Sequence, residues 1–100
     1  MTLSITNLLS LLDTPDDDRW FDNTSLLARR EIDTAPTKVV STLLELWNNL
    51  TTNQQEHLAY ILSSGNSPLE DSLITQMCLS ENKGVAYRAW VASLSPQSSA

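Results

Sequence analysis

Apolar residues recur at helical spacing along almost the whole chain, and this feature restricts the fold more than any other. Near the N-terminus, Ile5, Leu8, Leu9 and Leu12 follow the i, i+3, i+4, i+7 pattern of a single helix face. Leucines dominate the apolar residues, whereas residues with a strong preference for β-strands are few. The pattern therefore predicts an all-α protein.

About six short helices are expected, and their ranges follow from the apolar spacing and from the residues that start and stop helices. The third helix has the broadest apolar face, which predicts a central position. Because the connections are short, neighbouring helices should be antiparallel and stack as helical hairpins, either HEAT-like or as a compact bundle. We expect one helical domain over residues 1–94, followed by a disordered tail over 95–100. The predicted helices span roughly 3–12, 16–31 with a possible break near 23, 34–49, 52–62, 67–80 and 84–94.

Several helix boundaries carry local capping signals. A Ser or Thr followed by Pro, or by Gln or Glu three residues later, is typical of a helix start. This pattern occurs at Thr14–Pro15, Thr52–Gln55 and Ser67–Glu70. Gly65 is suited to the left-handed conformation of a C-terminal cap, which predicts that the fourth helix ends beside it.

The net charge of −6 limits the partners of this chain. Nucleic-acid binding needs clustered Lys and Arg, and only six such residues are scattered along the sequence. An anionic membrane surface is disfavoured for the same reason, and no apolar run approaches the ~18 residues of a membrane span. The lone Cys78 forms no internal disulfide, and the N-terminus does not resemble a signal peptide. We therefore expect a cytoplasmic protein, whose negative charge favours solubility or a basic protein partner.

The sequence contains little that supports catalysis. His57 is the sole histidine, and Cys78 lies one helix further on, so we expect a surface histidine and a buried structural cysteine rather than a nucleophile pair or metal site. No phosphate-binding loop or Cys-x-x-Cys is present, and no cofactor or metal is expected. Two carboxylates that meet in space could still perform acid–base chemistry, but the sequence favours a protein without enzymatic activity. The expected ion pairs join Arg29 or Arg30 to Glu31 or Asp33.

The densest cluster of one charge consists of Asp13, Asp16, Asp17, Asp18 and Asp22. One interpretation is helix-start chemistry, since carboxylates in a first turn interact favourably with the helix dipole. Calcium binding is a second, but an EF-hand loop needs a glycine at its sixth position and none occurs here. The third is a partner-binding surface in which the acidic groups flank Trp20 and Phe21 as aromatic anchors. Because Trp20 lies among charges, we expect it to be exposed, whereas Trp47 and Trp90 lie on apolar faces and should be buried.

Residues 54–94 resemble a HEAT-like helical pair. The carrying segments are Leu-Ala-Tyr-Ile-Leu, Pro-Leu-Glu-Asp-Ser-Leu-Ile and Ser-Glu-Asn-Lys-Gly-Val-Ala-Tyr-Arg-Ala-Trp. Asn82 and Val85 occupy positions of the family's turn and following helix, while Ala86 stands where a basic residue is usual. The resemblance implies a curved helical stack that binds macromolecules through a groove.

In size, acidity and lack of catalytic residues the chain also resembles bacterial toxin-immunity proteins. That resemblance implies a stoichiometric inhibitor that masks the active site of a basic toxin domain, such as a nuclease. The alternative is an adaptor or subunit of a larger complex that uses a HEAT-like groove, and a small enzyme is a third possibility. For the inhibitor, the expected partner-binding residues are Asp16, Asp17, Asp18, Trp20 and Asp22.

Overall fold

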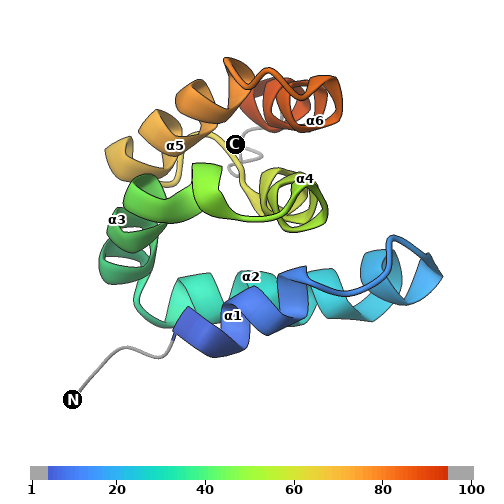
Figure 1. Cartoon of the computed structure of the whole chain (residues 1–100). Helices are drawn as coiled ribbons and strands as arrows, with labels where there is room; N and C mark the ends of the chain where they lie inside the picture. Colours follow the sequence, from blue (N-terminus) through green and yellow to red (C-terminus); the bar gives the residue numbers. More distant parts are fainter. Residues whose placement is uncertain (1–4, 95–100) are drawn as a thin grey trace.

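The computed structural model describes residues 5–94 of the chain. The secondary structure of these residues consists of helical segments (Figure 1). This confirms the predicted all-α fold of six helices, with no strand in the described range. None of these helices is long and apolar enough to cross a membrane. The expected tail at 95–100 lies outside the described residues. The segments are α1 (Ile5–Leu12), the π-helical η1 (Trp20–Thr24), α2 (Ser25–Thr34), α3 (Pro36–Leu46), the 3-10 turn η2 (Trp47–Asn49), α4 (Thr52–Ile61), α5 (Pro68–Cys78) and α6 (Lys83–Leu94).

Helix α4 holds the central position in the stack (Figure 1). On one side it packs against α1 and α2, and on the other it packs against α6, which pairs with α5. Helix α3 contacts α2 and α5 and joins the two halves along one side. The expectation that the third helix is central is therefore wrong. The apolar pattern understated the buried face of α4 because His57, a polar residue, is part of it.

One apolar cluster runs through all six helices and forms the core. Trp47 is buried as expected, and its indole N–H donates to Gln76 Oε1 at 3.1 Å. Trp90, in contrast, is 53% exposed, so its predicted burial is wrong. Helix α6 turns the small residues Ala89 and Ala92 inward, because its close packing on α4 and α5 leaves no space for an indole.

The helix ends follow the predicted chemistry with two changes of position. Ser67 caps α5 as expected by accepting the backbone N–H of Glu70 at 3.1 Å. The capping box of α4 is formed by Thr51 and Gln54, one residue before the predicted pair, because adjacent Thr and Gln residues offer the same chemistry in two registers. Gly65 has the left-handed φ of +90° that only glycine adopts readily, but α4 already ends at Ile61, so Gly65 shapes the following loop.

Candidate functional site

The acidic segment comprises residues 13–22 and follows α1 in the chain. Its backbone becomes helical at Asp18 and continues into η1. The start of that helix differs from the prediction. Thr14 does not cap it, because its hydroxyl donates back to the carbonyl of Leu11 at 2.9 Å and closes α1. The Asp17 carboxylate instead accepts the backbone N–H of Trp20 at 3.3 Å, which satisfies a free donor in the first turn. All five carboxylate residues of the predicted cluster are exposed, namely Asp13, Asp16, Asp17, Asp18 and Asp22.

Asp16 fastens this segment to the central stack. Its Oδ1 lies 3.1 Å from Nε2 of His57, on α4, and accepts a hydrogen bond from Nη2 of Arg88, on α6, at 3.3 Å. Partial burial opposes ionisation of Asp16, but the hydrogen bond from His57 and the charge of Arg88 outweigh it, so the pKa of Asp16 is lowered from its ordinary value. The carboxylate therefore acts as an anchor in addition to carrying charge.

His57 is fully buried, so the expectation of a surface histidine is wrong. Its Nδ1 lies 2.8 Å from the carbonyl of Leu12, while Nε2 faces Asp16. Because both neighbours are hydrogen-bond acceptors, the doubly protonated ring is the form that donates to both at once. The sequence did contain one signal for this burial, since His57 lies four residues before the inward-facing Ile61.

Trp20 is fully buried and stacks on His57, with ring centroids 3.8 Å apart and planes 13° from parallel. The prediction that it is an exposed aromatic contact is therefore wrong. Its indole N–H has no acceptor within the described residues. The next residue, Phe21, is 39% exposed and meets the ring of Tyr60 edge-on, with centroids 5.2 Å apart. Phe21, not Trp20, is thus the aromatic side chain at the surface beside the carboxylates.

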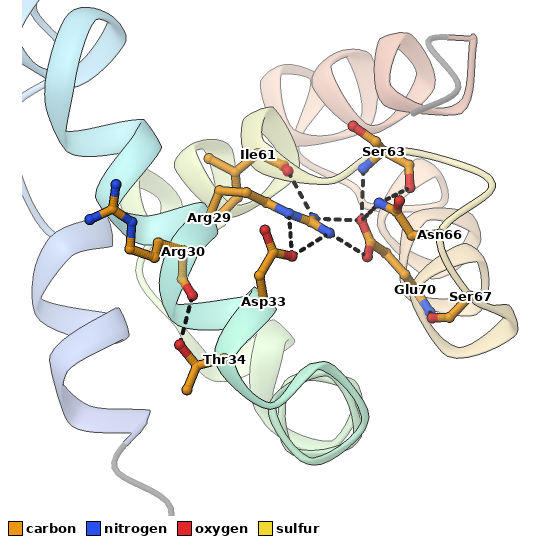
Figure 2. Close-up of polar contacts among 9 residues, drawn as sticks. All are labelled: Arg29, Arg30, Asp33, Thr34, Ile61, Ser63, Asn66, Ser67 and Glu70. Atoms are coloured by element: carbon orange, nitrogen blue, oxygen red, sulfur yellow. Dashed lines mark hydrogen bonds and ion pairs between the residues drawn. The ribbon is translucent and has the colours of Figure 1, made fainter. Parts of the chain in front are cut away.

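A second polar cluster links α2 to α5 around Arg29 (Figure 2). The expected pair of Arg29 with Asp33 is present at 3.1 Å. The guanidinium also makes a two-pronged contact with Glu70, at 2.7 and 3.1 Å, and donates to the carbonyl of Ile61 at 3.2 Å. Burial would lower the pKa of Arg29, but the bonds to Glu70 and the charge of Asp33 raise it above its ordinary value. Arg30 points away from this cluster in Figure 2.

Glu70 lies at the centre of that cluster. It is buried, and it is 41 residues away from Arg29 in sequence. Besides Arg29, it accepts the backbone N–H of Ser63 at 2.8 Å and the Asn66 side-chain amide at 3.1 Å. The predicted capping-box role, in which its carboxylate returns to Ser67, is replaced by these contacts. The cluster ties the α4–α5 loop to α2 and so fixes the position of α2 against α4.

The described residues offer little reactive chemistry. They contain no group of three or more His, Cys, Asp or Glu placed to hold a metal ion. Partial burial raises the pKa of the Cys78 thiol, which makes it a weaker nucleophile at neutral pH. Both nitrogens of His57 face acceptors other than Cys78. What the arrangement does provide is a row of carboxylates and one exposed aromatic ring on a firmly held segment.

Comparison with known proteins adds no further assignment: no known protein family, curated protein or solved structure matches this chain. The resemblances to HEAT-like pairs and to immunity proteins therefore stay predictions.

Proposed function

We propose that this protein binds a basic protein partner through its acidic segment, without catalysing a reaction, and that the partner is a toxin domain whose active site it masks. The observation that supports the proposal is the exposure of all five aspartates between residues 13 and 22. Within that stretch the only basic residue is Arg19. A surface of this kind is complementary to clustered Lys and Arg on a partner.

The mechanism combines electrostatic steering with steric blocking. The Asp16 carboxylate is bound to His57 and forms an ion pair with Arg88. Most of the electrostatic field that a partner meets therefore comes from the other four carboxylates, Asp13, Asp17, Asp18 and Asp22. Such a field speeds association by acting at distances of about a Debye length, ~8 Å at physiological salt. Burial of roughly 800 Å² on each protein would then cover the active site of a small toxin domain.

The firm attachment of the segment supports this role. Asp16 connects it to α4 and α6, and Asp17 caps the helix that carries Trp20 into the core. A surface that is already ordered loses less conformational entropy on binding than a flexible loop does. The carboxylates are thus presented in nearly the geometry that a bound partner would need.

The test begins with affinity capture from the source organism and identification of the captured protein. Association rates are then measured by stopped-flow at low and high salt. The variant is Asp18→Lys/Asp22→Lys, because neither carboxylate makes a hydrogen bond within residues 5–94 and its replacement should leave the fold intact. We expect the association rate at low salt to fall about tenfold and this effect to shrink at high salt.

The matched control is Glu45→Lys/Glu81→Lys, which changes the net charge equally at exposed sites outside the acidic segment. If both variants slowed association to the same extent, the whole-molecule charge and not this segment would be responsible. An unchanged rate for Asp18→Lys/Asp22→Lys, or a captured protein that is acidic, would refute the proposal.

A second candidate function, subunit or adaptor in a larger complex, is favoured by the outer face of α6. Tyr87, Trp90 and Leu94 lie on that face and are each more than half exposed. They repeat at i, i+3 and i+7, so they form one continuous apolar stripe of the kind found at interfaces. For this function Trp90→Ser should abolish co-purification with the partner, whereas for the inhibitor it should have no effect.

A further inference from the structure

A hollow of about 230 Å³ lies between the η1–α2 segment and the C-terminal end of α4. Its apolar lining comes from Phe21, Leu26, Tyr60 and Ile61, and its remaining lining is polar. The volume falls below the ~300 Å³ at which pockets for small-molecule ligands begin. The size suits one large side chain of a partner rather than a cofactor.

Phe21 lies at this hollow and belongs to the π-helical turn η1. Trp20 and Phe21 are consecutive residues of this turn, so their side chains leave the helix in different directions. Trp20 consequently lies fully inside the core, while Phe21 reaches Tyr60 on the outside. Such single-turn π-segments occur often at functional sites, where a regular helix would place side chains differently.

Two exposed carboxylates lie close in the chain to Phe21, which lines the hollow. Asp22 follows Phe21 in the chain and Asp18 precedes it by one turn, and both are exposed. The cation that lines the hollow, Arg29, is already held by the carboxylates of Asp33 and Glu70. The cation in the lining is therefore already paired, whereas Asp18 and Asp22 make no ion pair within residues 5–94, so a Lys or Arg of a partner beside Phe21 would meet free carboxylates.

We infer that this hollow receives one leucine or phenylalanine side chain that is flanked by Lys or Arg on the basic partner. The inference rests on the proposed function, and it adds the apolar anchor to a surface so far described by charge alone. Exposed apolar groups at the centre of a charged rim are the usual composition of a binding hot spot. Leu26, which is 64% exposed and lies on the same helical segment as Phe21, would pack against the incoming side chain.

The experiment uses blocked pentapeptides Lys-Arg-X-Lys-Arg, with X as Leu, Phe or Gly, titrated into the full protein and followed by NMR of its backbone amides. The Leu and Phe peptides should bind about tenfold more tightly than the Gly peptide, since burial of most of one apolar side chain is worth at least that factor. Their largest shifts should fall on the amides of Ser25, Leu26, Ile61 and Ser63, which line the hollow.

Two variants make the assignment specific. Leu26→Ala should reduce the difference between the Leu and Gly peptides to about threefold or less, because it removes part of the apolar lining. The control Leu79→Ala, at a residue 80% exposed outside the hollow, should leave that difference unchanged. Neither side chain is buried, so both variants should fold.

The outcomes separate this inference from the proposed function. Equal affinity of the Leu and Gly peptides, shifts elsewhere on the protein, or no binding by any peptide would overturn the apolar hollow. Asp18→Lys/Asp22→Lys should weaken all three peptides by a similar factor. If that variant had no effect while the Leu peptide still bound more tightly than the Gly peptide, the charge-based function would fail and the hollow would stand.

Discussion

Removal of the buried Glu70 carboxylate should destabilise the fold strongly, because this one group holds both Arg29 of α2 and the loop between α4 and α5. In Glu70→Ala, Arg29 loses the two bonds of 2.7 and 3.1 Å, and the backbone N–H of Ser63 loses its acceptor. Removing one partner of a buried ion pair costs about 3–5 kcal/mol, because the remaining charge stays away from water without compensation.

The structure argues for the lower end of that range. Arg29 keeps Asp33 and the carbonyl of Ile61, and its side chain is 21% exposed, so water can reach part of the guanidinium. We therefore expect the free energy of unfolding to fall by about 3 kcal/mol. For a domain of this length that loss corresponds to a decrease in Tm of roughly 15 °C.

The assay is urea unfolding followed by far-UV circular dichroism at neutral pH, with the slope of the transition checked for constancy. Asp33→Ala is the matched control, since it removes the other carboxylate bound to Arg29. Because Asp33 is 58% exposed, that change should cost at most about 1 kcal/mol. Replacement of both charges, as in Arg29→Met/Glu70→Leu, should restore much of the stability lost in Glu70→Ala.

The reasoning would be refuted by a cost below about 1 kcal/mol for Glu70→Ala, or by an equal cost for Asp33→Ala. Either result would mean that water solvates Arg29 and Glu70 in the folded protein, so the pair would not fix α2 against the α4–α5 loop. A double variant no more stable than Glu70→Ala would indicate that Ser63 and Asn66, not the arginine, account for the loss.

Three further predictions concern the segment around His57 and the loop after α4. Trp20→Ala should cost about 3–5 kcal/mol in urea unfolding, because it removes a fully buried indole and the ring stacked on His57; a cost near that of an exposed residue would contradict the stacking. Gly65→Ala should cost roughly 1–2 kcal/mol although nothing lies within 4 Å of the added Cβ, because the φ of +90° strains any other residue; an unchanged free energy of unfolding would contradict that strain. The pKa of Asp16 is lower in the folded than in the unfolded protein, so its stabilising contribution is complete above its ordinary value of 3.8 and is lost as the pH falls through the folded pKa. The stability difference between the wild type and Asp16→Asn, measured by urea unfolding at several pH values, should therefore be constant at neutral pH and shrink below pH 3.8; a difference that grows on acidification would contradict that sign.

Local signals in the sequence predicted the helices well but not always their exact starts. Ser67 and Pro68 start α5 as expected, because a cap needs only residues within one turn. At the start of α4 the same chemistry was available twice, and the structure uses Thr51 with Gln54. Such one-residue ambiguities are inherent to capping signals when equivalent residues are adjacent.

Among the predicted binding residues, the exposure of the aspartates was predicted correctly and that of Trp20 was not. The four aspartates among them are exposed, as a charged cluster in a short connection should be, but Trp20 is buried and Phe21 takes the surface position. The break predicted near residue 23 falls within the π-helical η1, but it did not indicate which of the two adjacent aromatic residues faces the core. Binding of the proposed partner at this surface stays a prediction.

The amino-acid sequence by itself determined that the chain forms about six helices, since apolar periodicity and capping act over a few residues. Only the tertiary structure decided that His57 joins Leu12 to Asp16 and that Arg29 meets Glu70, because those pairs are 41 to 45 residues apart in sequence. A buried polar residue is tolerated only where its partners arrive from other helices, and no local pattern specifies those partners.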